Sequence, residues 1–201
     1  MKLILSVILG YLIGAIPFAL VIGKLFYRTD IRRHGSGNLG GGNAGRVLGK
    51  KAGLAVMTCD LLKVSFVVLF ARLINGNDTV LACAAAAAGI GHCYPVFAGF
   101  RGGKAVAALY GFLFGLFAFA GRSSLYFFLP LIVFLIVLYL SKIISLSSIL
   151  SSAAVSAYLW IRPESMAVRA AVTFFALLIL FRHHANIGRM LRHEENKISW
   201  M

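Results

Sequence analysis

The stretch LILSVILGYLIGAIPFALVIG, residues 3–23, contains no charged side chain and few polar ones. As an α-helix, a run of this length crosses the hydrocarbon core of a bilayer, which is about 30 Å thick and needs about 20 residues. It follows Lys2 as a secretory signal would, but it is longer than the apolar region of a signal and has no A-x-A cleavage pattern. We therefore expect it to remain as a transmembrane anchor.

Six further apolar runs follow along the chain, and each is long enough for a helix. They cover residues 53–74, 79–98, 105–121, 124–141, 145–161 and 165–182. All are longer than the alternating segments of about 10 residues found in barrel strands. The composition agrees, since 60% of the residues are hydrophobic against about 45–50% in soluble domains. The sequence predicts an all-α integral membrane protein, a seven-transmembrane-helix bundle forming a single domain over residues 1–201.

The basic residues predict the orientation, because Lys and Arg are retained preferentially on the cytoplasmic side. With seven spans, one side carries Lys24, Arg28, Arg32, Arg33, Arg46, Lys50, Lys51, Arg101, Lys104, Lys142, Arg182, Arg189, Arg192 and Lys197. The other side has only Lys2, Arg122 and Arg162. We expect the N-terminus outside and the C-terminus in the cytoplasm.

The excess of 20 Lys and Arg over 6 Asp and Glu indicates an anionic partner. In a membrane chain, lipid headgroups and phosphorylated metabolites are favoured over nucleic acid. The three cysteines form no CxxC pair, so neither a disulfide framework nor a zinc site is indicated. No cofactor or metal is expected, and the sequence does not indicate an oligomeric state.

Two features within the spans predict contacts between helices. The motifs Gly10-x-x-x-Gly14 and Gly111-x-x-x-Gly115, with the alanine run 84–88, allow close backbone approach. Asp60 and Lys63 lie at i, i+3 spacing in one span, where an unpaired charge would be costly. We expect an ion pair facing the bundle interior; the alternative is a role in holding the first loop in place.

The most polar loop is GSGNLGGGNAGR, residues 35–46. A backbone with few side chains can turn several N–H groups toward one anion, and Arg46 adds a rigid positive fork. We interpret this loop as a phosphate cradle at the membrane surface.

Two more polar blocks fall on the same predicted side. GHCYPVFAGFRGGK, residues 91–104, ends with two glycines and Lys104 at the start of a helix, an arrangement suited to anions. In HHANIGR, residues 183–189, a continuing helix would place His183, Asn186 and Arg189 on one face. Taken alone, the first block could be a simple interfacial turn and the second a solvated tail.

Together, the three blocks closely resemble the bacterial acyl-phosphate glycerol-3-phosphate acyltransferases. The shared patterns are S-G-N-x-G-x-x-N-x-x-R (36–46), G-H-x-Y-P-V-F-x-x-F-x-G-G-K (91–104) and H-x-x-N-I-x-R (183–189). The resemblance extends over nearly the whole chain and includes D-x-x-K at Asp60 to Lys63 and Ser145-Leu146.

The resemblance implies a bacterial inner-membrane enzyme that transfers a fatty acyl group from acyl phosphate to the 1-hydroxyl of glycerol 3-phosphate. The products would be lysophosphatidic acid and inorganic phosphate, with the active site facing the cytoplasm. Matched residue by residue, the catalytic groups are Ser36, Arg46, Lys104, His183 and Asn186, and the substrate-binding groups are Asn38, Gly40, Gly41, Asn43 and Ser145. Two departures are visible: Gly41-Gly42 replace the more usual Ala-Thr, which should loosen the loop, and His193 replaces a frequent glycine, which puts the role of Glu195 in doubt.

Acyl phosphate is already activated, so positioning and charge stabilisation can suffice for direct transfer. The chain has no G-x-S-x-G elbow and no histidine followed five residues later by aspartate. Ser36 as an acyl-enzyme nucleophile is the alternative. His183 could act as general base, or a substrate phosphate oxygen could take the proton.

Two other classes of function are alternatives. A phosphate transporter would place polar groups near the bilayer midplane, whereas here they cluster at one edge. A metal-dependent lipid phosphotransferase would need several carboxylates, and the cytoplasmic side offers only Asp30, Glu194 and Glu195 outside the helices.

Overall fold

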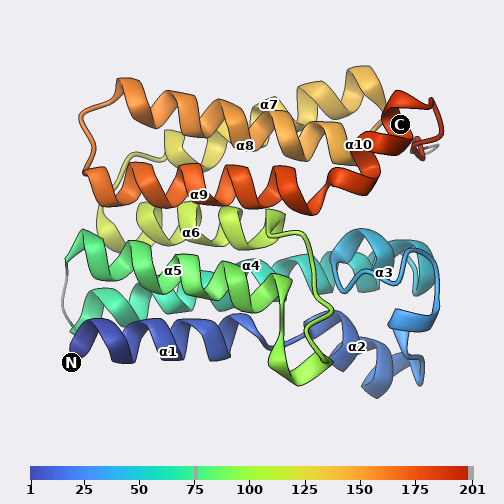
Figure 1. The fold of residues 1–201 in the computed structure, drawn as a ribbon, viewed down its shortest axis with the longest axis horizontal. Helices are drawn as coiled ribbons and strands as arrows, with labels where there is room; N and C mark the ends of the chain where they lie inside the picture. Colours follow the sequence, from blue (N-terminus) through green and yellow to red (C-terminus); the bar gives the residue numbers. More distant parts are fainter. Residues whose placement is uncertain (75–76, 199–201) are drawn as a thin grey trace.

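The computed structural model describes residues 1–74 and 77–198, and over these residues the chain is helical with short connections (Figure 1). The α-helices are α1 (Lys2–Gly14), α2 (Phe18–Tyr27), α3 (Gly41–Val47), α4 (Lys50–Ile74), α5 (Asp78–Cys93), α6 (Val106–Ala120), α7 (Leu125–Ser141), α8 (Ile144–Ile161), α9 (Met166–Arg182) and α10 (His184–Leu191). Two short 3-10 helices, η1 (Ile31–Arg33) and η2 (Val96–Ala98), lie in the connections. The predicted all-α class is confirmed.

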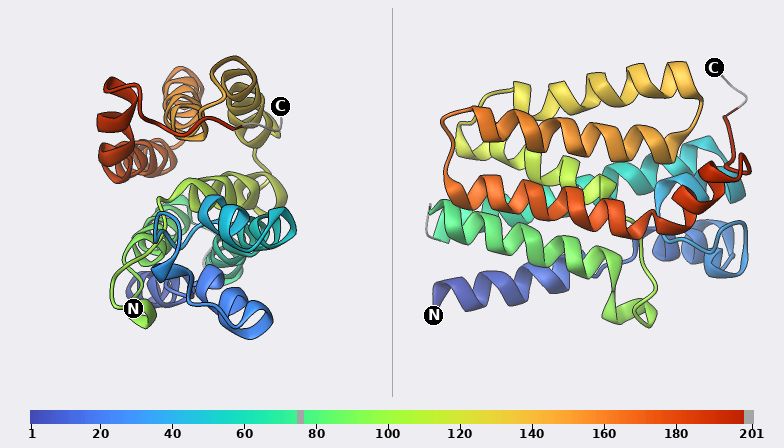
Figure 2. Two further views of the ribbon diagram at one scale, coloured as in Figure 1. Left: turned by 90° about the vertical axis from the view of Figure 1, so that its right-hand side faces the viewer. Right: turned by 45° about the horizontal axis from the view of Figure 1, so that its top comes forward.

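The long helices lie side by side with their axes roughly parallel (Figures 1 and 2). Four segments are long and apolar enough to cross a membrane: the broken segment Lys2–Tyr27, α4, Asp78–Ala98 and α8. The pair α9 and α10, bent by 55°, makes a fifth if counted as one span, and α6 and α7 are shorter apolar helices. The seven-span count and the orientation of the termini remain predictions.

The span expected over residues 3–23 lies within the candidate span Lys2–Tyr27 and is a broken helix. Helix α1 ends at Gly14, and α2 begins at Phe18 and continues to Tyr27. Pro17 lies at the break, where it has no N–H to donate to a helical bond. The Ile16 carbonyl instead accepts from Lys63 Nζ at 2.9 Å, so a side chain of α4 satisfies the exposed backbone.

Both glycine motifs make the predicted close contacts. A β-carbon on Gly10 or Gly14 would overlap the backbone of α5 at Ala84 or Ala88, and one on Gly111 would overlap the Leu61 carbonyl of α4. Small residues therefore bring α1 against α5 and α6 against α4 at backbone distance.

Asp60 and Lys63 form the predicted buried ion pair, with Lys63 Nζ 2.6 Å from Asp60 Oδ1. His92 on α5 completes the cluster, because its Nδ1 lies 3.2 Å from Lys63 Nζ and 3.6 Å from Asp60 Oδ1. All three residues are buried. Through the Ile16 carbonyl and His92, the ion pair joins α4 to the α1–α2 break and to α5.

The polar connections gather at one end of the bundle. Met1, the α6–α7 connection and the α8–α9 connection lie at the opposite end from α3, α10 and the loop that follows η2 (Figure 1). The three polar blocks of the sequence therefore share one end, as the predicted segregation of basic residues requires.

Candidate active site

Lys104 and Asn186 meet at this end, although 82 residues separate them in the sequence. Lys104 belongs to the loop before α6, and Asn186 to α10. The Lys104 Nζ donates to Asn186 Oδ1 at 2.5 Å, and the Asn186 amide nitrogen in turn donates to Glu195 Oε1. The second and third polar blocks are thus joined by a direct hydrogen bond.

Glu195 is the centre of this cluster. Besides Asn186, its carboxylate accepts from Ser145 Oγ at 2.8 Å and from Arg189 Nε at 2.7 Å. These hydrogen bonds outweigh the effect of burial, so the pKa of Glu195 lies below its usual value. An ionised carboxylate therefore holds the start of α8, helix α10 and the C-terminal segment together.

Lys104 lies in a strongly positive environment. Its pKa is lowered to about 8, mainly by burial and also by the nearby charges of Arg189, Arg46 and Arg182, whereas Glu195 acts in the opposite direction. Arg46 belongs to the first polar loop, so this loop lies within electrostatic reach of Lys104. Four cations face a single carboxylate, an arrangement suited to anionic reactants.

The third block does not lie on a continuation of the preceding helix, in contrast to the sequence-based expectation. The chain bends by 55° between α9 and α10, with His183 at the break. Asn186 and Arg189 still share a face, because both contact Glu195. The His183 Nδ1 lies 2.8 Å from the Ile179 carbonyl oxygen. Since a carbonyl only accepts, Nδ1 carries the proton and Nε2 of the neutral ring is left as an acceptor.

Asn43 organises the first polar loop. It is buried, its Oδ1 accepts from the Ser36 N–H at 2.9 Å, and its amide nitrogen donates to the carbonyls of His34 and Ile31. The Ser36 side chain and Arg46 are exposed at this end. Roles for these residues in binding substrate stay predictions.

The glycines of this loop differ in their surroundings. A β-carbon on Gly41 would overlap Met57 of α4, whereas one on Gly40 would meet only the Asn38 amide nitrogen, at 3.5 Å. The loop is thus packed tightly against α4 at Gly41, whereas a β-carbon on Gly42 would meet nothing within 4 Å, so the loosening expected from Gly41-Gly42 stays a prediction. Binding by Asn38, Gly40 and Gly41 stays a prediction.

Gly102 and Gly103 serve close packing beneath Lys104. A β-carbon on Gly103 would overlap the His92 ring, and one on Gly102 would overlap the His92 carbonyl. Arg182 Nε donates to the Gly103 carbonyl at 3.1 Å, and its guanidinium lies 5.0 Å from the centre of the Tyr94 ring. Arg182 and His92 thus support the Lys104 loop from two sides.

Sequence reasoning missed the central position of Glu195 and the support from Arg182. The substitution at His193 had put Glu195 in doubt. His193 has φ 59°, the left-handed region that glycine adopts most easily and that histidine tolerates better than most residues. The turn therefore forms with histidine, and Glu195 keeps its contacts.

The fold and this cationic cluster define a class, that of helical integral membrane proteins that handle anionic substrates at one end of the bundle. The family model described as "Glycerol-3-phosphate acyltransferase" matches residues 4–193. Proteins of that name from Geobacillus kaustophilus and Listeria monocytogenes are each 44% identical, covering 98% and 100% of this chain and 96% and 98% of their own lengths.

Two crystal structures of PlsY (YgiH), described as an integral membrane glycerol 3-phosphate acyltransferase, share the fold. The glycerol 3-phosphate form has a TM-score of 0.91 and the lysophosphatidic acid form 0.89, both at 34% identity and covering 99% of this chain and 96% of theirs. The chain belongs to the glycerol-3-phosphate acyltransferase family, and its place in phospholipid biosynthesis follows from the family. The resemblance drawn from the three polar blocks is confirmed.

Proposed function

We propose that this protein transfers a fatty acyl group from acyl phosphate directly to the 1-hydroxyl of glycerol 3-phosphate, giving lysophosphatidic acid and inorganic phosphate. The observation that carries the proposal is the Lys104–Asn186 hydrogen bond beside Glu195, within reach of the charge of Arg46. Two phosphate-bearing reactants repel each other in water, and a cluster of cations offsets that repulsion. The comparison structures in glycerol 3-phosphate and lysophosphatidic acid forms support the acceptor and the product.

In the proposed arrangement, the loop 36–46 and Arg46 bind the phosphate of the donor. Ser36, Asn38, Gly40 and Gly41 line this loop, and Asn43 holds its shape through its buried hydrogen bonds. Lys104 and Asn186 bind the acceptor phosphate, and Ser145 positions Glu195 through the 2.8 Å hydrogen bond. Binding both reactants side by side contributes by proximity and orientation.

The reaction then needs one proton transfer. The glycerol hydroxyl oxygen attacks the acyl carbonyl carbon, the bond from that carbon to the phosphate oxygen breaks, and the departing phosphate takes the hydroxyl proton. His183 Nε2 accepts a hydrogen bond from the hydroxyl and orients it. Burial, together with the nearby charges of Lys104 and Arg182, lowers the pKa of His183 to about 4, which disfavours an imidazolium there and supports phosphate as the proton acceptor.

Direct transfer is proposed over an acyl-enzyme on Ser36. In the described part of the chain, no histidine or carboxylate is hydrogen-bonded to the Ser36 hydroxyl. The backbone N–H of Ser36 donates to Asn43 Oδ1. A serine without such a partner is a weak nucleophile. A stable labelled acyl-protein after exposure to acyl phosphate alone would overturn direct transfer.

In the defining experiment, the purified protein is reconstituted in lipid and supplied with glycerol 3-phosphate and either acyl phosphate or acyl-CoA. The measured product is lysophosphatidic acid. We expect product with acyl phosphate and no dependence on added chelator, because the proposed chemistry uses protein cations. Product from acyl-CoA alone would refute the donor, and loss of activity with chelator would favour a metal-dependent phosphotransferase.

Replacing His183 with glutamine separates orientation from proton transfer. We expect turnover to stay within about tenfold of the wild type, because a general base contributes about 10²–10⁴ and His183 is not proposed as one. Steady-state kinetics at saturating donor measures this. A loss of about 10² or more would identify His183 as the base.

The pKa of Lys104 predicts the pH dependence. Because burial lowers this pKa to about 8, Lys104 is charged below that pH and loses its charge above it, so kcat/KM for glycerol 3-phosphate should fall as pH rises through about 8. In Glu195→Gln the decline should begin at lower pH, because the Glu195 charge raises the pKa of Lys104. Glu194→Gln is the matched control, since Glu194 is exposed and pairs with Arg192. An unmoved profile in Glu195→Gln would contradict the assignment.

We place the protein in the bacterial inner membrane as a multi-pass enzyme whose active site faces the cytoplasm. The proposal rests on the gathering of the basic loops and the three polar blocks at one end of the bundle (Figure 1). Labelling residues 36–46 and 183–189 from each side of the membrane tests it, and opposite accessibilities of the two segments would refute it.

A further inference from the structure

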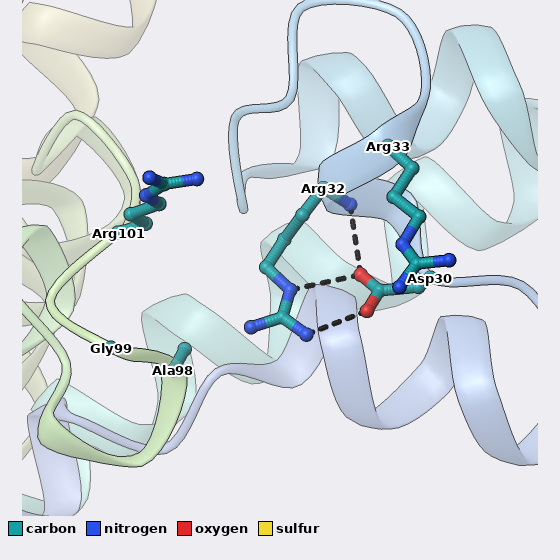
Figure 3. A pocket seen from close by; sticks show the side chains of 6 residues that line it. All are labelled: Asp30, Arg32, Arg33, Ala98, Gly99 and Arg101. Atoms are coloured by element: carbon teal, nitrogen blue, oxygen red, sulfur yellow. Dashed lines mark hydrogen bonds and ion pairs between the residues drawn. The ribbon is translucent and has the colours of Figure 1, made fainter.

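A cationic cavity lies outside the candidate active site, between η1 and η2. It has a volume of about 410 Å³ and is lined by Asp30, Arg32, Arg33, Ala98, Gly99 and Arg101 (Figure 3). Lys104 and Arg101 are close in sequence but have different neighbours. Lys104 is hydrogen-bonded to Asn186 on α10, whereas Arg101 faces η1 (Figure 3). The cavity is therefore a separate feature of the same end of the bundle.

The charges around this cavity leave it positive. Arg32 binds Asp30 through two hydrogen bonds, Nε to Oδ1 at 2.9 Å and Nη2 to Oδ2 at 2.6 Å. The hydrogen bond from Arg32 holds the pKa of Asp30 below its usual value, so this carboxylate stays ionised and neutralises one arginine. In the part of the chain that the structure describes, neither Arg33 nor Arg101 forms an ion pair.

The walls of the cavity are ordered by local structure. Asp30 also caps η1 by accepting from the Arg32 N–H at 3.1 Å, and Ile31 is fully buried beneath it. On the opposite wall, Gly99 and Phe100 both have positive φ, 65° and 61°. This double turn directs Arg101 back toward η1 (Figure 3). The two segments thus present guanidinium groups to one space before any ligand arrives.

The turn that bears Arg101 also carries exposed apolar side chains. Val96, Phe97 and Phe100 are 43%, 59% and 59% exposed. Aromatic side chains at the end of a membrane bundle sit at the level of the lipid headgroups. A molecule with a phosphate in the cavity and acyl chains along these side chains would satisfy both features.

We infer that Arg33, Arg101 and Arg32 form an accessory phosphate-binding site for the headgroup of an anionic phospholipid in the surrounding leaflet. Guanidinium groups bind phosphate oxygens through paired N–H donors, and anionic headgroups are attracted to basic residues at the membrane surface. This site is additional to the proposed function and does not depend on it. A free phosphate ion has the same binding chemistry, so the test must separate the two sources.

The test uses the full chain in neutral detergent and native mass spectrometry, with phosphatidic acid, phosphatidylcholine or inorganic phosphate as the probe. We expect phosphatidic acid to bind in preference to phosphatidylcholine. The double variant Arg33→Gln/Arg101→Gln should bind it about thirtyfold more weakly, from the loss of two arginines near an anionic headgroup. The matched control, Arg192→Gln/Lys197→Gln, removes two exposed charges from the C-terminal segment and should bind as the wild type does.

Three results would overturn the inference. The first is unchanged phosphatidic acid binding in the double variant, and the second is an equal weakening in the control. The third is binding of inorganic phosphate at the same residues with the same affinity, because the site would then be one for free anions. If the double variant does not fold, Arg101→Gln alone replaces it, with an expected weakening of about fivefold. Glycerol 3-phosphate turnover in phosphatidylcholine bilayers should be unaffected by Arg101→Gln, so failure of the accessory site and failure of the proposed function are distinguishable.

Discussion

Lys104→Met is expected to lower kcat/KM for glycerol 3-phosphate by about 10²–10³, the cost of removing one group that stabilises charge at a reacting centre. Lys104 is the cation that joins the second polar block to the third, through its 2.5 Å hydrogen bond to Asn186. Methionine keeps much of the length of the side chain but leaves the Asn186 oxygen without this donor. Initial-rate kinetics in nanodiscs, with lysophosphatidic acid as the measured product, gives the loss directly.

The control for this variant is Lys2→Met, which removes the same charge from an exposed residue at the opposite end of the bundle (Figure 1). It should retain wild-type kinetics. Thermal unfolding of both variants distinguishes loss of chemistry from loss of fold. Activity of Lys104→Met within a few-fold of the wild type would remove Lys104 from the proposed mechanism.

Lys63→Met is expected to destabilise the fold by about 3–5 kcal/mol, because removing one partner of a buried ion pair leaves the other charge uncompensated. Asp60 and Lys63 are 1% and 5% exposed, and one Asp60 oxygen already has no hydrogen-bond partner among the described residues. The variant also leaves the Ile16 carbonyl at the α1–α2 break without its donor. Reversible unfolding in mixed detergent micelles measures the change in the free energy of unfolding.

Two further variants identify the cause of this instability. Asp60→Asn/Lys63→Met removes both charges and should be more stable than Lys63→Met, since no lone buried charge remains. Lys51→Met, at the exposed start of the same helix, should be close to the wild type. If Lys63→Met unfolds with the wild-type free energy, the cluster does not hold the α1–α2 break.

The prediction of helices succeeded because hydropathy decides which segments can enter a bilayer. The expected runs near 79–98, 124–141 and 165–182 correspond to Asp78–Cys93 with η2, α7 and α9. The first run, 3–23, lies within the candidate span Lys2–Tyr27, and its break falls at the one proline of the run, a residue that interrupts helices. Helix α10 was missed as a separate element, because the 55° bend between α9 and α10 is not marked by a pattern in the local sequence.

The structure brings part of the predicted site together. Lys104, Ser145 and Asn186, assigned through the family resemblance, meet around one carboxylate in the structure, whereas substrate binding by Ser36, Asn38 and Arg46 stays a prediction. Glu195 was left in doubt because its importance lies in three partners from distant segments. No spacing within the C-terminal tail could show those partners.

By itself, the sequence determined that this is a membrane protein and that its polar blocks lie at one end of the bundle, because charged and glycine-rich segments are excluded from hydrocarbon and must gather at its edge. Tertiary structure alone decided which side chains touch: His92 over Gly103, Arg182 beneath the Lys104 loop, and Glu195 between α8 and α10. These contacts depend on how the helices pack and bend. The local sequence around a residue does not show which distant residues it will contact.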